Sequence, residues 1–579
     1  MKRWAAALAV LLLSGCGLPL SEGVQSAGEV PGEQAEPAGI QVLPPGPQPG
    51  ATAVDLVRGF LRAQSSPDDD HAVARQFLAP ETEWDEEEFA IVYAPGSQTV
   101  RADPDDPGRV EVRLRATARI GADGSYRLVP SDTEVPPEQF RVQRGQDGEL
   151  ELTEVPPGLR ITTADVSRSF VPSDVYLLGQ GAEGEATSVL VPDRVFLPAT
   201  VEPAVARVTA LLTGASAPLA PAVQTAVPPG TTLVSPVVVE DGVVTVDLSA
   251  QVRELSALDR ERLSAQLVWT LQDQTGVRLL ADGEPLEIPG AGEVQNRDDW
   301  SGYDPGRPLR NAPLVYVEDR TVRSLDAPLE AGGVTRPGSL EVDAVAVSPA
   351  DGTLGVLTRR DGPDEVRIGP PQGSTGEPAF TREDIGSLSW GSGKRGLWVL
   401  ERSDPPRVWV LPGPGASPDD RDQEVLVGRP GGVGPLSSLA VSRDGARIAL
   451  VFGQDDERQL FVGRVQPTAG GVRVADVVPV APLLRNVTDV AWESGTSLVV
   501  IATDSSAAGL LTLTVTVDGS SVVPLQRQGI EGVPVSVAAA PGRQLVVEAV
   551  QEGQQPRLFR DNGVLFRPQA QGSAPAYPG

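Results

Sequence analysis

One cysteine and one histidine occur among the 579 residues of this chain, so few side chains could do covalent or metal chemistry. Zinc and copper sites are built mainly from cysteine and histidine, so a site with the usual ligands of either metal cannot be assembled. The sequence has neither a Gly-x-Ser-x-Gly elbow nor a Walker loop, and glycine pairs such as Gly431-Gly432 fit turns rather than phosphate cradles. We therefore expect no enzyme, no cofactor and no metal.

The only histidine, His71, lies beside Asp70 in a strongly acidic stretch. Residues 66–106 carry twelve acidic side chains against two arginines. For His71 we expect a capping or surface role, and for the stretch a solvated acidic face, since no run has the central glycine and terminal glutamate of an EF-hand. Carboxylates are abundant along the whole chain, so a carboxylate pair that hydrolyses glycans stays open as the enzymatic alternative.

The N-terminus has the pattern of an export signal. Lys2 and Arg3 precede an apolar run of ten residues, Trp4 to Leu13, which is too short to cross a bilayer but has the size of a signal h-region. The run ends in Leu13-Ser14-Gly15-Cys16, which resembles the lipobox of bacterial lipoproteins. The resemblance implies that residues 1–15 are a signal peptide and that Cys16 is diacylated, with chains such as palmitate. The alternatives are an ordinary signal with a chance cysteine and an uncleaved anchor.

The overall charge restricts the partners of the mature chain. The formal charge is −30, and about −32 once Lys2 and Arg3 are removed. A chain this acidic is repelled by nucleic acid and by anionic lipid headgroups, so we expect no nucleic-acid partner. No later apolar run reaches membrane-spanning length, so the lipid on Cys16 is the expected anchor. We therefore expect the protein on the extracytoplasmic side of the cell membrane.

Composition divides the mature chain into a tether and three folded regions. Residues 21–50 hold six prolines and six glycines with almost no large apolar side chain, which is typical of a tether. The predicted parts are the lipidated N-terminus with its tether (16–50), an α+β N-terminal domain (51–170), a second α+β domain (171–289), a linker (290–312) and a β-propeller (313–579).

The N-terminal domain is predicted to begin with two helices and to continue in strands. Val54 to Leu61 places apolar residues at helical spacing, and Ala72 to Leu78 fits a second short helix. Beyond Pro95 the pattern has period two, first in Val110 to Ala116. Two helices followed by a curved antiparallel sheet resemble the cone of the nuclear transport factor-like fold, in element order alone.

The second domain carries a more specific set of motifs. A strand near Ser188 to Leu197 precedes a helix over Pro203 to Leu212, and Glu240-Asp241-Gly242 joins the two strands of a predicted hairpin, Leu233 to Val239 and Val243 to Leu248. A helix over Leu258 to Leu271 and a strand over Val277 to Leu280 follow. The phrases Leu211-Leu212-Thr213-Gly214, Pro229-Gly230-Thr231 and Val246-Asp247-Leu248-Ser249 resemble the GerMN domain of spore-germination proteins, which implies a small binding module.

The C-terminal region repeats one unit. Each copy is a strand, a turn that is often Asp-Gly, and a second strand, with equivalent positions at Val347, Trp390, Val441, Trp492 and Ala539. A period of about 40–50 residues is typical of propeller blades. We expect five or six blades, with a hairpin over Leu314 to Leu325 completing the ring. Truncation before Val535 is expected to give insoluble protein, and removal of residues 570–579 to have little effect.

The whole mature chain resembles the LpqB family of lipoproteins in the order of its parts, which are the lipobox, the tether, the α+β block, the GerMN-like domain and the propeller. The resemblance implies an accessory protein of a two-component system. Its partner would be the extracellular domain of the MtrB sensor histidine kinase, and the signalling would affect cell-wall homeostasis and division. The alternative function is a cell-wall ligand-binding protein or a glycan hydrolase.

Overall fold

The structure is a computed structural model that describes residues 44–579, apart from the short segments 131–132, 134, 182–184, 308–312, 328, 330–334, 336–339, 360, 372–375, 392–394, 414–420, 469–470 and 505–508. Residues 45–579 form one compact unit. The predicted signal peptide, Cys16 and the tether up to residue 43 lie outside the described residues. Within the described part, no helix is long and apolar enough to span a membrane.

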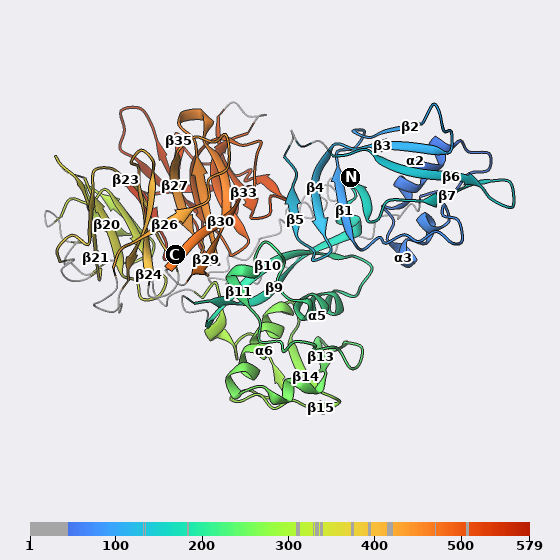
Figure 1. Ribbon diagram of the computed structural model, residues 1–579. Helices are drawn as coiled ribbons and strands as arrows, with labels where there is room; N and C mark the ends of the chain where they lie inside the picture. Colours follow the sequence, from blue (N-terminus) through green and yellow to red (C-terminus); the bar gives the residue numbers. More distant parts are fainter. Residues whose placement is uncertain are drawn as a thin grey trace, which may run out of the picture. The chain divides into compact units, whose positions relative to one another are not determined.

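The N-terminal domain is α+β, as predicted, but its strands form two four-stranded sheets rather than one (Figure 1). One sheet has the order β5-β4-β1-β8, with β1 and β8 parallel, and the other has the order β2-β3-β6-β7. The elements are α2 (Ala53–Ala63), α3 (Asp68–Arg75), β1 (Phe89–Tyr93), β2 (Thr99–Ala102), β3 (Arg109–Arg113), β4 (Ala116–Gly121), β5 (Tyr126–Leu128), β6 (Glu138–Arg144), β7 (Leu150–Glu154) and β8 (Leu159–Thr162).

Helix α2 is amphipathic, and its apolar face forms part of the core of this domain. Thr52 caps the helix by accepting a hydrogen bond from the Asp55 amide (3.2 Å), which satisfies one of the free N–H groups of the first turn. Phe60 is fully buried, and its ring contacts those of Trp84 and Phe140 at centroid distances of 5.1 and 6.2 Å. These contacts fix the helix on the sheet of β2, β3, β6 and β7.

The surface role predicted for His71 is wrong, because the side chain is buried. Helix α3 begins at Asp68, four residues before the predicted start, and Asp69, Asp70 and His71 have left-handed backbone angles (φ of 47°, 58° and 55°). This irregular first turn places the imidazole against the ring of Trp84, with 5.8 Å between centroids and 8% of the residue exposed. Burial lowers the pKa of His71, against the opposing effect of Glu86 and Asp70.

The middle domain confirms the two predicted helices and the Asp-Gly hairpin. Asp241 and Gly242 both have positive φ (50° and 77°), as a two-residue turn between antiparallel strands requires. The long strand β9 was missed by the sequence analysis. The elements are α4 (Val166–Ser169), β9 (Phe170–Gln180), β10 (Ala186–Pro198), α5 (Pro203–Thr213), η1 (Ala220–Ala222), β11 (Val223–Gln224), β12 (Val238–Glu240), β13 (Val243–Leu248), η2 (Ala250–Glu254), α6 (Ala257–Thr270), β14 (Gly276–Ala281), β15 (Glu284–Pro285), β16 (Val294–Gln295) and η3 (Ser301–Tyr303).

The C-terminal region is a propeller of six blades, which settles the choice between five and six. The predicted hairpin is β17 (Val315–Glu318) and β18 (Thr321–Ser324), and it forms the last blade together with β39 (Ser573–Ala576). The other five blades are β19 (Ala344–Val347) to β22 (Phe380–Arg382), β23 (Ile385–Trp390) to β26 (Gln423–Val427), β27 (Leu436–Val441) to β30 (Gly471–Pro479), β31 (Arg485–Trp492) to β34 (Val522–Pro524), and β35 (Val533–Ala538) to β38 (Phe566–Gln571).

The strands inside these blades alternate in direction, so each blade is an antiparallel sheet. They are β20 (Leu354–Thr358), β21 (Asp364–Gly369), β24 (Arg395–Glu401), β25 (Arg407–Pro412), β28 (Arg447–Phe452), β29 (Gln459–Thr468), β32 (Ser497–Thr503), β33 (Leu510–Thr516), β36 (Val546–Val550) and β37 (Arg557–Asp561). The outer strands β26 and β30 also pair with each other, in parallel, which joins two neighbouring blades into one eight-stranded sheet.

The innermost strands form a closed ring, and the last strand of the chain completes it. In ring order they are β19, β23, β27, β31, β35 and β39, each in contact with the next, and β39 is in contact with β19. Strand β39 also pairs with β17, and the Gly579 amide donates to the Val347 carbonyl (3.0 Å). The expectation that residues 570–579 can be removed with little effect therefore conflicts with the structure, since these residues supply an inner strand.

Buried side chains join neighbouring inner strands by hydrogen bonds to the backbone. Trp390 Nε1 donates to the Ala346 carbonyl (3.1 Å), and Trp492 Nε1 donates to the Ala440 carbonyl (2.9 Å). Asp489 Oδ2 accepts from the Val537 amide (2.8 Å), and burial raises the pKa of this carboxyl. The two tryptophans occupy equivalent positions of the sequence repeat, so the repeat marks the places where blades are held together.

Candidate binding cleft

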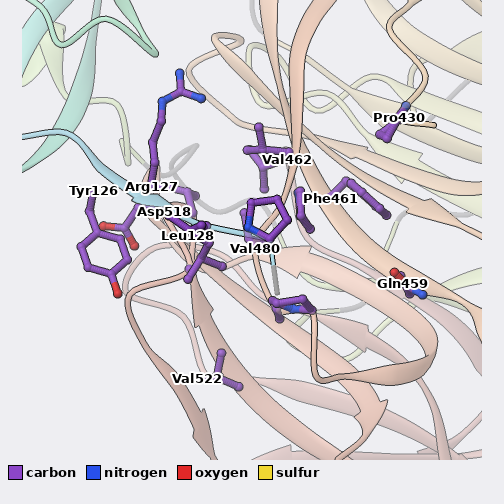
Figure 2. A pocket seen from close by; sticks show the side chains of 18 of the residues that line it. Tyr126, Arg127, Leu128, Pro430, Gln459, Phe461, Val462, Val480, Asp518 and Val522 are labelled. Carbon is purple, nitrogen blue, oxygen red and sulfur yellow. The ribbon is translucent and has the colours of Figure 1, made fainter. Parts of the chain in front are cut away.

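The described residues form a cleft of about 1390 Å³, and all three regions contribute to its lining. Figure 2 shows part of this lining. The N-terminal domain contributes β5 and its flanking residues, and the middle domain contributes Asp193 and Arg194 of β10 and the loop after α5. The propeller contributes β29, β30, the loop 479–485 and the edge strand β34. The cleft is larger than the roughly 300–1,000 Å³ of small-molecule sites, so it has room for a larger ligand.

Strand β5 reaches the cleft because its turn is anchored on the middle domain. The Gly124 carbonyl accepts from the Phe196 amide (2.8 Å), and the ring of Tyr126 stacks on Phe196 with 5.0 Å between centroids. A Cβ at Gly124, where φ is 75°, would lie 3.0 Å from the Val195 side chain, so glycine is required here. Burial raises the pKa of Tyr126 to about 12, with a smaller contribution from the Asp518 carboxylate.

Asp123 fastens the same turn to the loop that follows α5. Its Oδ2 accepts from the Ala217 amide (2.8 Å), and its Oδ1 accepts from the amide and the hydroxyl of Ser125 (3.0 and 2.6 Å). Partial burial by itself would raise the pKa of this carboxyl, but the three hydrogen bonds outweigh it and the pKa is lowered. Asp123 is therefore a stable anion that holds two domains together.

Two arginines share one carboxylate where the N-terminal domain meets the propeller. Arg127 of β5 binds Asp476 of β30 through two parallel hydrogen bonds, of 3.2 and 2.6 Å. Arg464 of β29 lies 3.6 Å from the same carboxylate and donates to the Pro218 carbonyl of the middle domain (2.6 Å). Burial lowers the pKa of Arg464, and Asp476 partly offsets this effect. One charge cluster thus connects all three regions.

A second cluster joins the middle domain to the propeller. Arg447 Nη2 of β28 donates to the Pro192 carbonyl (2.8 Å), and Arg194 Nε lies 3.4 Å from Asp518 Oδ2. Asp193 is buried, and it accepts from the amide and the hydroxyl of Ser216 (both 2.7 Å). Burial raises the pKa of Asp193, and the Ser216 hydrogen bonds and Arg447 oppose the rise.

The remaining lining is largely apolar. Figure 2 shows Leu128 of β5 next to Val480 of the loop after β30, with Phe461 and Val462 farther along the wall. Leu128 also contacts the turn after β33, since a Cβ at Gly519 would lie 2.6 Å from its Cδ1. Leu483, 73% exposed, and Val522, 39% exposed, face the cleft without being covered. Exposed apolar side chains gathered in a hollow are typical of an interaction site.

A smaller pocket of about 180 Å³ lies between the middle domain and the inner strands of the propeller. Its lining includes Asp174, Tyr176, Trp269, Asp304 and Arg443. Burial raises the pKa of both carboxyls, and it lowers the pKa of Arg443. Carboxyls with raised pKa in a concave site are candidates for acid–base chemistry.

The residues singled out in the sequence lie apart from the cleft, with one exception. Cys16 is outside the described residues, and His71 and Asp70 belong to α3, which contributes nothing to the lining. Gly431 and Gly432 do line the cleft, in the connection between β26 and β27. In the described part of the chain, no group of three or more histidine, cysteine, aspartate or glutamate side chains could hold a metal ion.

Sequence reasoning missed the arginines that build the cleft. Arg127 and Asp476 are 349 residues apart, and Arg464 and Pro218 are 246 apart. Neither the spacing nor the local pattern of a sequence carries information about such pairs. The one usable signal was local: Asp-Gly turns at 123–124 and 518–519 mark two of the tips that meet here.

Three family models match the sequence, in the order of the three regions. They are described as "Lipoprotein LpqB, N-terminal domain" (residues 46–167), "Sporulation and spore germination" (174–287) and "Lipoprotein LpqB beta-propeller domain" (315–578). Among curated proteins, "Lipoprotein LpqB" of Thermobifida fusca is 30% identical over 99% of this chain and 98% of that protein. "Lipoprotein LpqB" of Streptomyces coelicolor is 26% identical over 98% of this chain and 96% of that protein.

Solved structures similar to parts of the chain are more distant. The first GerMN domain of the sporulation protein GerM from Bacillus subtilis is 22% identical over 22% of this chain and 98% of that one, with a TM-score of 0.18. TolB from Acinetobacter baumannii is 14% identical over 46% of this chain and 67% of that one, with a TM-score of 0.36.

Proposed function

This chain belongs to the LpqB family of lipoproteins, and on that premise we propose that it is a membrane-anchored accessory protein that binds the ectodomain of a sensor histidine kinase. In this proposal the lipid on Cys16 holds the protein on the extracytoplasmic face of the cell membrane. The partner is an MtrB-like kinase, and binding modulates two-component signalling linked to cell-wall homeostasis and division. The protein itself performs no catalysis.

The cleft is the observation that carries this proposal. It exceeds small-molecule sites in volume, exposes apolar side chains, and is bordered by arginines that are held in place by hydrogen bonds across domains. An apolar hollow with a charged border has the composition of a protein interaction surface. Arg127, Arg464 and Asp476 serve contacts between domains, which supports a binding role over a catalytic one.

The kinase proposal is tested by binding. Lipidated protein in nanodiscs would be mixed with the purified kinase ectodomain at low and at physiological salt, and the dissociation constant measured by biolayer interferometry. We expect saturable binding that weakens as salt rises, because charged groups border the cleft. An unrelated lipoprotein in the same nanodiscs is the control. Absence of saturable binding at either salt concentration would overturn the proposal.

The anchor is tested separately. Cys16 is the single cysteine, so Cys16→Ala leaves no thiol for acylation. We expect the variant to leave the membrane fraction after a high-salt wash, whereas the unmodified protein stays. A variant that still sediments with membranes would show that something other than the lipid holds the protein there.

One observation favours the alternative of a cell-wall ligand binder or glycan hydrolase. The 180 Å³ pocket brings together Asp174 and Asp304, both with raised pKa, beside the rings of Tyr176 and Trp269. Carboxyl pairs next to aromatic rings occur in glycosidases. The pocket is smaller than the usual range for ligand sites, so we rank this function second. Release of reducing ends from peptidoglycan glycan strands, abolished by Asp174→Asn and Asp304→Asn, would support it.

A further inference from the structure

The free edge of strand β5 suggests how the cleft holds its partner. Strand β5 is the last strand of its sheet, and it pairs with β4 alone among the described residues. All three of its residues, Tyr126, Arg127 and Leu128, line the cleft. The side of β5 that faces away from β4 therefore borders the cavity.

The register shows which backbone groups are free on that side. The Gly121 amide donates to the Ser125 carbonyl, and the Val129 amide donates to the Thr117 carbonyl, both at 2.9 Å. Between these two pairs, Arg127 is the residue that exchanges hydrogen bonds with β4, because such pairs alternate along an antiparallel ladder. The N–H and C=O groups of Tyr126 and Leu128 consequently point away from β4.

The lining around this edge has the chemistry of a mixed apolar and cationic surface. Leu128, Leu483 and Val522 provide uncovered or partly covered apolar groups. Arg115 is exposed, and Arg485 donates to the carbonyls of Pro482 and Leu484. Within the described residues, neither arginine forms an ion pair with a carboxylate. The chain as a whole is strongly acidic, so arginines without a carboxylate partner mark a local preference for carboxylates here.

We propose that the cleft binds an extended segment of the kinase ectodomain as an additional strand along β5. The segment would donate to and accept from the backbone of Tyr126 and Leu128, place apolar side chains against Leu483 and Val522, and present carboxylates to Arg115 and Arg485. This inference rests on the proposed kinase-binding function and names the part of the partner that is recognised. Strand addition to a free sheet edge is a general mode of peptide recognition.

An amphiphile with an anionic head is the competing occupant of such a cleft. Its head could reach the arginines and its chain the apolar wall, but the chain would lie along β5 without satisfying the N–H and C=O groups of Tyr126 and Leu128. Leaving polar backbone groups against hydrocarbon is unfavourable. A polypeptide satisfies them, and the backbone edge therefore favours the peptide over the amphiphile.

The test uses the lipidated full chain in nanodiscs and the purified kinase ectodomain. Leu483→Glu places a charge on the apolar wall, and Leu426→Glu is its matched control, because Leu426 is 77% exposed and lies outside the lining. We expect Leu483→Glu to weaken binding by about tenfold or more, as for a residue at the centre of an interface, and Leu426→Glu by less than about twofold. Arg115→Glu should weaken binding less than Leu483→Glu, and the exposed Arg567→Glu outside the cleft should leave it unchanged.

Hydrogen exchange supplies the readout that is specific to strand addition. On binding of the ectodomain, the amides of Tyr126 and Leu128 should exchange at least about tenfold more slowly, because they become hydrogen-bonded. Dodecyl phosphate, a probe for the amphiphile, should neither protect these amides nor displace the ectodomain.

The other possible results overturn either the proposed function or the proposed strand addition. If the unmodified chain does not bind the ectodomain, the proposed function fails and this inference fails with it. If the ectodomain binds but Leu483→Glu binds normally and the two amides stay unprotected, the inference alone fails. If dodecyl phosphate displaces the ectodomain without protecting the amides, an amphiphile site replaces the strand site.

Discussion

The junctions between propeller blades differ from the ion pair that joins the N-terminal domain to the propeller. Between blades, the buried side chains of Trp390 and Trp492 and the half-buried Asp489 bond directly to the backbone of the neighbouring inner strand. Between the N-terminal domain and the propeller, Arg127 and Asp476 form a partly exposed ion pair, with 41% and 29% of their side chains accessible. A buried hydrogen bond is costly to leave unmade, whereas an exposed ion pair contributes little to stability.

This difference separates stability from recognition within one chain. The propeller is a closed ring, so the loss of any junction between blades exposes backbone groups and apolar surface. Loss of the Arg127–Asp476 contact should change the border of the cleft more than it destabilises the fold of the protein. Substitutions in the ring should therefore act on unfolding, and substitutions in the cleft should act on binding. Four predictions test this division, from the largest expected effect to the smallest.

The largest effect is expected from removal of the closing strand. A chain ending at Gln571 loses β39, the Tyr577 hydroxyl that donates to the Gln544 carbonyl, and the Gly579 amide bond to Val347. Strands β17 and β19 then lie at open edges, so we expect aggregation and a loss of most soluble protein. The measurement is the soluble fraction after expression, with deletion of residues 21–28 from the predicted tether as the control. A soluble, cooperatively unfolding chain would show that the ring does not depend on β39.

The second prediction removes one junction between blades. Trp390 is 2% exposed, so Trp390→Phe leaves the Ala346 carbonyl without its donor and a void beside it. We expect a loss of about 2–3 kcal/mol of stability, measured by denaturant unfolding. The control is Trp409→Phe in the same blade, where Nε1 donates to the Glu401 carboxylate at a half-buried site. Equal losses in the two variants would contradict the special role of the inner strands.

The third prediction concerns the pH dependence of ring closure. Glu548 of β36 accepts from the Ala574 amide of β39 (2.8 Å), and burial raises its pKa from 4.5 to about 7, with a further contribution from Asp489. Between pH 4.5 and about pH 7, the folded state binds more protons at Glu548 than the unfolded state does. The contribution of Glu548 to stability is therefore lost as the pH rises through this window, by up to about 3 kcal/mol.

Glu548→Gln should abolish this dependence. Compared with the unmodified chain, the variant should gain several degrees in melting temperature between pH 5 and pH 8, as measured by scanning calorimetry at both pH values. The control is Glu531→Gln, an exposed carboxylate paired with Arg557, for which the difference should stay constant. A difference for Glu548→Gln that is the same at pH 5 and pH 8 would contradict the raised pKa.

The smallest effect on stability is expected in the cleft. Arg127→Ala removes the paired hydrogen bonds to Asp476, and we expect a loss of less than about 1 kcal/mol, because the pair is partly exposed to solvent. The same variant should weaken ectodomain binding by several-fold, since it alters the border of the cleft. Unfolding and binding assays on one preparation would test both statements, and a loss of stability above that of Trp390→Phe would reverse the comparison.

The sequence predicted the propeller well because its signal is local and repeated. Strand, turn and strand recur within about 50 residues, and the tryptophans at 390 and 492 occupy the same place in the unit and in the ring. Helices α5 and α6 were predicted for a similar reason, since their apolar residues recur with the helical period.

The cleft could not be predicted, because its contacts join residues hundreds of positions apart. Arg127, Arg464 and Asp476 are ordinary charged residues in ordinary strands, and their meeting depends on how the domains are placed. The position of His71 was missed for a different reason. Three successive non-glycine residues with left-handed backbone angles, Asp69 to His71, are rare. The sequence pattern therefore placed the helix start at Ala72 and gave no sign that His71 turns into the core.

The pairing of β17 with β39 has a consequence for the synthesis of the chain. Val315 pairs with Ala576, so the first blade of the propeller to be made is the last to be completed. An unfinished polypeptide therefore keeps an open ring, with strand edges of the kind that chaperones and proteases engage. The propeller loses these open edges once β39 pairs with β17.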